Sequence, residues 1–360
     1  MRVLVTAANK GTPMTKTHQI LLALLGTAAL SACGGGTSEG TRESVRAVGS
    51  STVYPFAKLV AENFTKSNAD FDSPIVESTG TGGGIELFCQ GVGAATPDIA
   101  NASRRMKASE YEKCKKNGVT EITEIQVGLD GIAFASKKGG IDMNLTPEMV
   151  YRALAANPYG KKNTTKTWHD VDPSLPAKPI LVYGPPSTSG TRDALKELIL
   201  VAGCDANPEM KALKDSDKDK HEQVCTEVRD DGAYVDQGEQ DNLIVQKIEG
   251  NADAIGVFGY SYLEENMDQI HGLKMNGVEP TYENIASFTY PGARPLFIYV
   301  KNAHLDAIRG LREFVGQWTK SWSKGGPLAK IGLVASPADV AAKSQAAATQ
   351  FTPLAPTELK

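Results

Sequence analysis

A run of hydroxyl side chains, glycine and arginine in the middle of the sequence could bind an anion. Residues 187–192 read Ser-Thr-Ser-Gly-Thr-Arg and follow the largely apolar run 179–184. That run contains β-branched and aromatic residues, which predicts a strand. Apolar residues recur at helical spacing over 193–201, which predicts a helix. The hydroxyl-rich run therefore lies between a strand and the start of a helix.

The first residues of this helix would supply hydrogen-bond donors. Ser189, Gly190 and Thr191 lie where the first N–H groups have no partner inside the helix and where the helix dipole favours a negative charge. Arg192 adds a charged fork that suits a tetrahedral oxyanion. An ordinary N-cap beside a surface arginine would explain this run if it stood alone.

The same order of strand, small polar turn and helix occurs three more times. The turns are Gly49-Ser50-Ser51-Thr52, Thr79-Gly80-Thr81-Gly82-Gly83-Gly84 and Ala102-Ser103-Arg104-Arg105. One such junction is typical of capping, but four indicate an anion site. The glycine run is neither a P-loop nor a dinucleotide fingerprint, because no Gly-Lys-Ser/Thr ends it and Ile85 stands where the last glycine belongs.

Composition limits the class of protein. The chain has 360 residues, 41% of them hydrophobic, and a net charge of −4. This length and hydrophobic content predict a real core divided between two lobes or domains. The negative charge argues against a nucleic-acid partner, whereas a small anion needs only a few donors. Strands that alternate with helices throughout predict an α/β fold with parallel strands.

The N-terminus has the pattern of an export signal. Lys10 and Lys16 precede an apolar run over 20–30 that is too short to span a bilayer. It ends in Leu-Ser-Ala-Cys at 30–33, which resembles a bacterial lipobox. We therefore expect a lipoprotein signal peptide over 1–32, lipid attachment at Cys33 and a flexible tether over 33–45. A plain secretory signal is the alternative.

Four further cysteines remain: Cys89, Cys114, Cys204 and Cys225. An even number in an exported chain predicts disulfide bonds, with three possible pairings. The local pairing is favoured, Cys89 with Cys114 and Cys204 with Cys225, and each loop would be worth about 3 kcal/mol. No Cys-x-x-Cys motif occurs, and no metal site or cofactor is expected.

Taken together, these segments resemble the phosphate-binding protein of bacterial phosphate ABC transporters. The segments that carry the resemblance span residues 49–260: Gly49-Ser50-Ser51-Thr52-Val53-Tyr54-Pro55, Ser78-Thr79-Gly80-Thr81-Gly82-Gly83-Gly84, Asp98-Ile99-Ala100-Asn101-Ala102-Ser103-Arg104, Ser189-Gly190-Thr191-Arg192 and Ala254-Ile255-Gly256-Val257-Phe258-Gly259-Tyr260. The resemblance implies a two-lobed α/β periplasmic binding protein of type II, with the ligand in the cleft between the lobes. Lobe I would comprise 46–138 and 288–348, lobe II 139–287, and the C-terminal tail 349–360.

The resemblance also implies the site residues. The phosphate-binding residues would be Ser51, Thr52, Thr81, Gly82, Ser103, Arg104, Ser189, Gly190, Thr191 and Arg192. Many members have an aspartate where Arg104 stands, to accept the proton of hydrogen phosphate. We therefore expect Arg104 and Arg192 to act as charged clamps and Asp241, or a carbonyl, to supply the acceptor.

The expected function is high-affinity binding of inorganic phosphate and its delivery to the permease and ATPase of an ABC transporter. The protein would be a monomer in the periplasm or cell envelope, held to the membrane by its lipid. The first alternative keeps the fold and changes the anion to phosphite, phosphonate, sulfate or molybdate. The second is a phosphatase with Ser189 as nucleophile. It is disfavoured because the five histidines are scattered and none lies in a catalytic motif.

Overall fold

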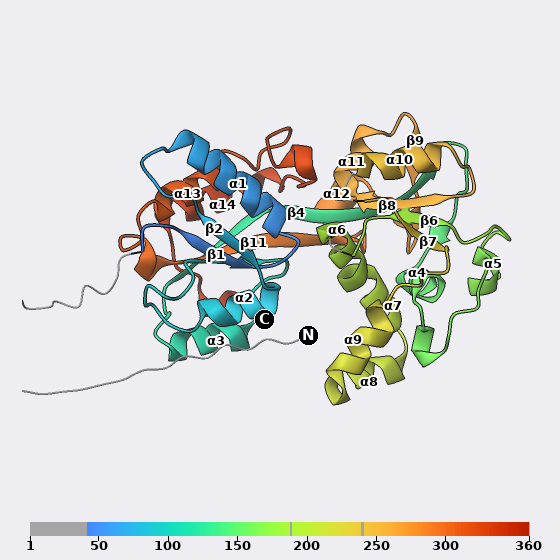
Figure 1. Cartoon of the computed structure of the whole chain (residues 1–360), viewed down its shortest axis with the longest axis horizontal. Coiled ribbons are helices and arrows are strands. Elements are labelled where there is room, and N and C mark those ends of the chain that lie inside the picture. Colours follow the sequence, from blue (N-terminus) through green and yellow to red (C-terminus); the bar gives the residue numbers. More distant parts are fainter. Residues whose placement is uncertain (1–41, 188, 239–240, 360) are drawn as a thin grey trace, which may run out of the picture. The chain divides into compact units, whose positions relative to one another are not determined.

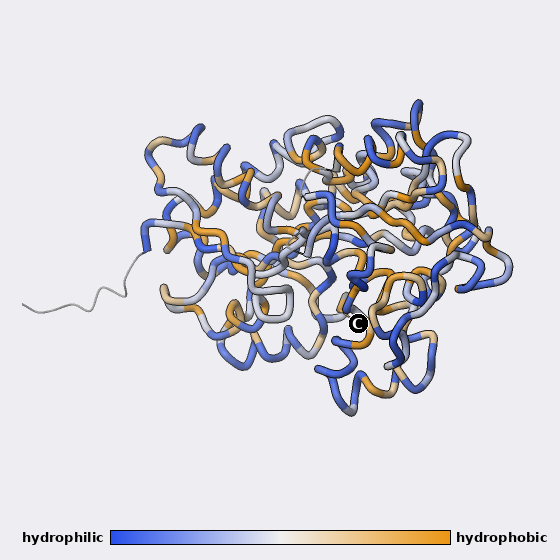
Figure 2. The backbone as a smooth tube through the Cα atoms, turned by 45° about the vertical axis from the view of Figure 1, so that its right-hand side comes forward, coloured by the Kyte–Doolittle hydropathy of each residue, from blue (hydrophilic) through white to orange (hydrophobic). Residues whose placement is uncertain are grey.

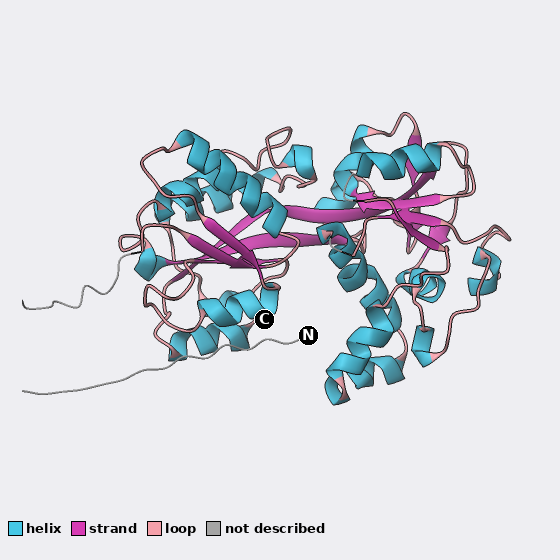
Figure 3. Cartoon of the chain, viewed as in Figure 1, coloured by secondary structure: helices cyan, strands magenta, loops and turns pink. Residues whose placement is uncertain are grey.

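The computed structural model describes residues 42–187, 189–238 and 241–359. All of these residues belong to one compact unit, Glu39–Lys360. Strands and helices alternate along most of the chain, as predicted for an α/β fold (Figure 3). Among the residues described, no helix combines the length and the apolar character needed to cross a membrane.

The strands of the described chain form one nine-stranded sheet in the order β2-β1-β3-β11-β4-β8-β6-β7, with β9 beside β4. A separate pair is formed by β5 (Asn144–Leu145) and β10 (Lys274–Met275). The strands of the large sheet are β1 (Arg46–Gly49), β2 (Ile75–Ser78), β3 (Ile99–Ala102), β4 (Ile122–Lys137), β6 (Val182–Gly184), β7 (Tyr234–Asp236), β8 (Ile255–Gly259), β9 (Ile270–Gly272) and β11 (Ala293–Lys301).

Helices cover both faces of this sheet. The α-helices are α1 (Tyr54–Ser67), α2 (Thr81–Phe88), α3 (Ala108–Lys116), α4 (Pro147–Leu154), α5 (Trp168–Val171), α6 (Gly190–Ala194), α7 (Val201–Cys204), α8 (Pro208–Ser216), α9 (Lys218–Thr226), α10 (Asp241–Glu249), α11 (Tyr260–Glu265), α12 (Tyr282–Ala286), α13 (Leu311–Thr319) and α14 (Ala338–Gln350). A π-helical stretch, η2 (Leu195–Leu200), joins α6 to α7 without a break. Short 3-10 turns occupy η1 (Pro158–Gly160), η3 (Asn302–His304), η4 (Ala329–Ile331) and η5 (Pro356–Glu358).

The first half of the sheet is formed by β1, β2, β3 and β11. Strand β1 is parallel to β2 and β3, and β11 is antiparallel to β3. Helices α1, α13 and α14 cover one face of these strands, and α2 and α3 cover the other (Figure 1). Alternate residues of β11 fill the two cores: Leu296 and Ile298 lie in the first, Phe297 and Tyr299 in the second. This period of two is what a strand buried on both faces requires.

Strand β4 belongs to both halves of the sheet. Residues 122–131 of β4 pair with β11, and residues 132–135 pair with β8, which is parallel to β6. A separate hydrophobic core surrounds the second half and includes Phe134, Leu154 and Phe258. In Figure 2 the hydrophobic stretches gather along the strands and the hydrophilic ones along outer loops and helix faces. The division into lobes at residues 138/139 and 287/288, with a tail from 349, stays a prediction.

Two disulfide bonds join the cysteines in the predicted local pairing. Cys89 is bonded to Cys114, and Cys204 to Cys225. His221 lies against the second bond, but both of its neighbouring sulfurs are shared in the disulfide and no thiolate is left to bind a metal. Cys33 lies outside the described residues, so its lipidation stays a prediction.

Candidate functional site

The polar turns predicted to form a site follow three neighbouring parallel strands. Because β2, β1 and β3 are parallel and adjacent, their carboxyl ends meet at one edge of the sheet. Main-chain bonds hold the turns together there: the Ser50 amide donates to Asn101 over 2.9 Å, and the Thr79 amide donates to Gly49 over 2.8 Å. Helix α1 begins just after the first of these turns, and helix α2 begins within the second.

The glycine run has a structural role at one end. Helix α2 begins at Thr81, so Gly82, Gly83 and Gly84 lie inside its first turn, whereas the sequence pattern predicted them in the turn before the helix. A Cβ on Gly84 would lie 2.3 Å from the Cα of Gly49, so this position needs glycine for β1 and α2 to pack. A Cβ on Gly82 would meet no atom within 4 Å, so that backbone lies open.

The second set of donors begins the helical run α6–η2–α7. Ser189 is the N-cap of α6, and its hydroxyl oxygen accepts a hydrogen bond from the Thr191 amide over 3.2 Å. A Cβ on Gly190 would lie 3.2 Å from the Cα of Thr52 and 3.5 Å from the carbonyl oxygen of Ser51. Glycine therefore lets the start of α6 approach the end of β1. The Ser51 hydroxyl also donates to Asp193 over 2.5 Å.

A cavity of about 160 Å³ lies where these two segments meet. A single water needs only about 10–15 Å³ of such space, so the cavity has room for a ligand of several heavy atoms. Its walls combine hydroxyl and backbone groups with two apolar side chains of α1 and one carboxylate. The lining residues are Thr52, Pro55, Phe56, Asp130, Ser189, Gly190, Thr191, Gly259, Tyr262, Ile331 and Gly332.

An ion-pair network that the sequence did not predict stands at this wall. Arg294 of β11 and Asp130 of β4 are register partners, and the Arg294 Nε donates to Asp130 Oδ2 over 3.1 Å. The same guanidinium donates to the Thr52 hydroxyl over 2.7 Å and pairs with Glu197 of η2. Burial raises the pKa of Asp130, the charge of Arg294 opposes this effect, and Glu197 adds to it.

Thr81 and Ser103 come together in a separate pair. The Ser103 amide donates to the Thr81 hydroxyl over 3.1 Å, and the two hydroxyl oxygens lie 3.0 Å apart. Neither residue is among those that line the cavity. The structure therefore brings Thr52, Ser189, Gly190 and Thr191 together and leaves these two hydroxyls beside them at the ends of β2 and β3.

The two predicted clamp arginines have protein partners. Arg104 forms a two-pronged pair with Glu110, with distances of 2.9 and 2.6 Å, and this bond raises the pKa of the guanidinium. Arg192 is buried, donates to the Pro185 carbonyl over 3.2 Å and stacks 4.2 Å from the centre of the Tyr234 ring. Their role as clamps stays a prediction, and the guanidinium found at the cavity wall is that of Arg294.

The predicted acceptor Asp241 begins α10, but its side chain lies outside the described residues. Sequence reasoning missed Asp130 and Arg294, although each left a signal. Asp130 interrupts the apolar run 127–134, and Arg294 directly precedes the apolar run 295–300. Charged residues inside buried strands are rare unless they are paired, so each residue indicated that an oppositely charged partner lies elsewhere in the chain.

Comparison with known proteins agrees with this fold. Residues 34–319 match the PBP superfamily domain. Protein SphX of Synechococcus elongatus is 34% identical over 86% of this chain and 81% of its own length. The phosphate-binding protein PstS of Staphylococcus saprophyticus is 32% identical over 79% of this chain and 80% of its own length.

Among solved structures, a possible phosphate binding protein from Planctomyces limnophilus is 26% identical and superimposes with a TM-score of 0.68. The match covers 86% of this chain and 99% of that protein. The Staphylococcus relative and the Planctomyces structure are named as phosphate-binding proteins. The chain belongs to the PBP superfamily and, within it, to the two-lobed α/β proteins represented by PstS and SphX.

Proposed function

We propose that this protein binds inorganic phosphate in the cavity between the end of β1 and the start of α6, and delivers it to the permease and ATPase of an ABC transporter. The observation that carries the proposal is the contact of Gly190 with Thr52, which places donors from both halves of the sheet around one cavity. Relatives of similar length are named phosphate-binding protein PstS, which favours phosphate over other oxyanions.

The proposed ligand contacts are neutral donors. Thr52, Ser189, Gly190 and Thr191 line the cavity and offer hydroxyl and N–H groups. Ser51 lies directly beside them through its bond to Asp193. Thr81, Gly82 and Ser103 would add donors from the neighbouring strand ends, and Arg104 and Arg192 would add positive charge at longer range.

Binding without chemistry is the favoured mode. The cavity walls among the described residues contain no histidine, cysteine or lysine. Among the described residues, the Ser189 hydroxyl oxygen accepts from the Thr191 amide, and the one carboxylate of the wall, Asp130, is paired with Arg294. No hydrogen bond joins Ser189 to a base that would activate it as the nucleophile of the phosphatase alternative. Turnover of a chromogenic phosphate ester that disappears with Ser189→Ala would overturn this part of the proposal.

The proposal also covers location. We expect export through the segment 1–32, lipid attachment at Cys33 and a monomer held at the outer side of the membrane by the tether 33–45. The two disulfide bonds favour an oxidising compartment. Labelling with a radioactive fatty acid, with Cys33→Ser as control, tests the anchor. Labelling that persists in that variant would contradict it.

Calorimetry on the full chain carrying Cys33→Ser tests the ligand. After removal of bound phosphate, titration with phosphate should give one-to-one binding, and Thr52→Val should weaken it about tenfold or more because it removes a donor at the wall. Thr65→Val is the matched control, since Thr65 lies on α1 and its hydroxyl donates to the Ala61 carbonyl. Heat from sulfate, phosphite or molybdate but none from phosphate would overturn the assignment.

A further inference from the structure

A second cavity lies beside β4, outside the candidate site. Its volume is about 370 Å³, against about 160 Å³ for the candidate site, and this size falls in the range of pockets that hold small organic molecules. Strand β4, helices α12 and α14 and the segments 322–324 and 335–336 contribute to its wall. The lining residues are Gln126, Val127, Tyr282, Trp322, Ser323, Lys324, Ala335, Ser336, Ala338 and Ala341. Among the described residues, the two cavities share no lining residue, so the second cavity is a separate site.

The wall of this cavity offers a ligand mainly apolar and aromatic surface. Trp322 and Tyr282 line it together with one valine and three alanines. The Gln126 Nε2 donates to the Ser336 hydroxyl over 3.2 Å, and the Tyr282 hydroxyl donates to the Ala335 carbonyl over 3.1 Å. These polar groups therefore already have partners within the protein, and a ligand would gain most from an apolar body that packs against the two aromatic side chains.

One positive charge lies at this wall. Lys324 is the only charged residue among the described residues that line the cavity. Its Nζ lies 5.6 Å from the centre of the Tyr282 ring and 3.8 Å from Oε1 of Glu264. The contact with Glu264 is long and 79% of the Lys324 side chain is exposed, so this ion pair is weak. Charge complementarity therefore predicts a ligand with one anionic group beside its apolar body.

Both predicted lobes contribute residues to this cavity. Tyr282 belongs to the segment predicted as lobe II, 139–287, and Ala335 to the segment predicted as lobe I, 288–348. The hydrogen bond between these two residues joins the two segments. Gly332, three residues before Ala335, lines the candidate site. A molecule in the second cavity would thus contact both segments, close to where the chain lines the candidate site.

We propose that the second cavity binds a small aromatic carboxylate and that this molecule stabilises the arrangement of the lobes in which the candidate site is formed. The aromatic ring would contact Trp322 and Tyr282, and the carboxylate would pair with Lys324. A ligand favours one arrangement of a protein only through contacts that the other arrangement lacks. Here the contacts with Tyr282 and Ala335 depend on the two lobes lying as they do in the structure. The coupling rests on the proposed phosphate binding, whereas the second cavity as a binding site does not.

Calorimetry with 4-phenylbutyrate on the full chain carrying Cys33→Ser tests the binding site. We expect one-to-one binding, and about threefold weaker binding of the neutral 4-phenylbutanamide, which keeps the ring but lacks the charge. Lys324→Met should weaken 4-phenylbutyrate by the same factor, and Ala341→Leu should weaken it at least about tenfold because leucine fills part of the cavity. Lys320→Met, at an exposed lysine outside the cavity, should leave the affinity unchanged. Undiminished affinity in both cavity variants, or no binding at millimolar concentration, would overturn the site.

The coupling is measured by titrating phosphate with and without saturating 4-phenylbutyrate. The phosphate dissociation constant should fall at least about fivefold, and saturating phosphate should lower the dissociation constant of 4-phenylbutyrate by the same factor. Unchanged or raised constants would overturn the coupling. If phosphate does not bind at all, the proposed function fails together with the coupling. Binding of 4-phenylbutyrate that Ala341→Leu weakens would still establish the second cavity as a site.

Discussion

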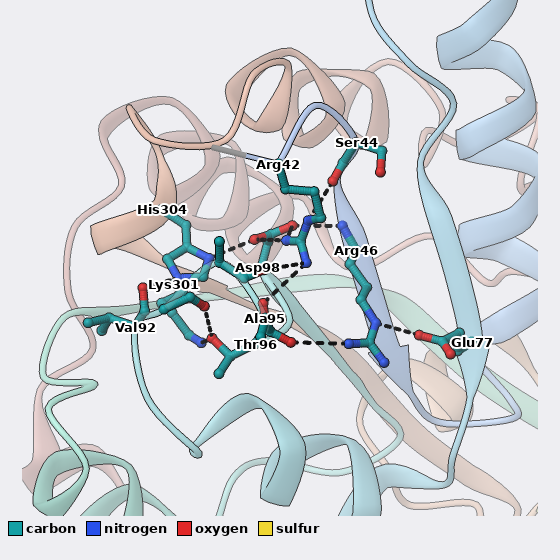
Figure 4. A network of polar contacts seen from close by, with 12 residues as sticks. Arg42, Ser44, Arg46, Glu77, Val92, Ala95, Thr96, Asp98, Lys301 and His304 are labelled. Atoms are coloured by element: carbon teal, nitrogen blue, oxygen red, sulfur yellow. Dashed lines mark hydrogen bonds and ion pairs between the residues drawn. The ribbon is translucent and has the colours of Figure 1, made fainter. Parts of the chain in front are cut away.

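A buried lysine outside the candidate site makes the stability of the fold depend on pH. Lys301 is fully buried at the end of β11 and donates to the Gly91 carbonyl over 2.5 Å and to the Thr96 hydroxyl over 2.7 Å. Asp98 lies nearby (Figure 4). Its carboxylate already accepts two hydrogen bonds of 2.5 Å from Arg42 and contacts His304 Nδ1 over 2.6 Å.

Burial therefore dominates the titration of this lysine. It lowers the pKa of Lys301 to about 7, although Asp98 acts in the opposite direction. A lysine in the unfolded chain titrates near 10.4, so the unfolded state binds more protons than the folded state between about pH 7 and 10. Stability then rises with pH across this window, by about 1.4 kcal/mol per pH unit from this group alone and by roughly 5 kcal/mol in total.

The test is to remove the titrating group and compare slopes. Urea unfolding of the unsubstituted chain and of Lys301→Met is measured at pH 7, 8 and 9 with the disulfides intact. The unfolding free energy of the unsubstituted chain minus that of Lys301→Met should rise by about 2.3 kcal/mol between pH 7 and 9, because the folded amine is already half deprotonated at pH 7. Lys211→Met, which changes an exposed lysine of α8, should show no such rise. A flat or falling difference for Lys301→Met would show that the buried amine stays charged, and would refute the reasoning.

Two further variants test the site and the scaffold. Gly190→Val should weaken phosphate binding at least tenfold in calorimetry, because its side chain would keep the start of α6 away from Thr52; undiminished affinity would show that this contact is not part of the bound state. The double variant Cys204→Ser with Cys225→Ser should lower the unfolding free energy by about 3 kcal/mol in urea and leave phosphate affinity within twofold. A loss of binding there would mean that the disulfide shapes the cavity.

Local patterns were sufficient to predict that some of the hydroxyl-rich turns lie together. Strand, hydroxyl-rich turn and helix recur in order along the chain, and parallel strands bring their carboxyl ends to one edge. Thr52 and the residues 189–191 therefore line one cavity, while their part in phosphate binding stays a prediction. The helix boundaries were less accurate. Apolar residues recur at helical spacing over 304–322, which predicts one long helix. The α-helix is only Leu311–Thr319, because Gly310 takes a left-handed conformation with φ of 84° just before it.

Local patterns could not predict which charged side chains form ion pairs. The pair of Asp130 and Arg294 joins residues 164 positions apart and depends on the register of β4 against β11, which no local pattern specifies. Arg104 is a different case, because its partner Glu110 lies six residues further on and also accepts a hydrogen bond from the Lys107 amide over 2.9 Å at the start of α3.

The arrangement of charges explains how a weakly acidic protein with net charge −4 could still bind an anion. Arg294 is matched by Asp130 and Glu197, so the cavity wall has no surplus positive charge from this cluster. Attraction must then come from N–H and O–H dipoles that the strand ends and the start of α6 hold in place. Fixed dipoles are matched to the positions of oxygens and protons, whereas a free guanidinium would attract any oxyanion. Because Asp130 and Glu197 neutralise Arg294, the cavity attracts oxyanions in general less strongly and depends more on how well the ligand fits the fixed dipoles. This dependence gives selectivity, which a phosphate carrier needs in a medium that contains sulfate.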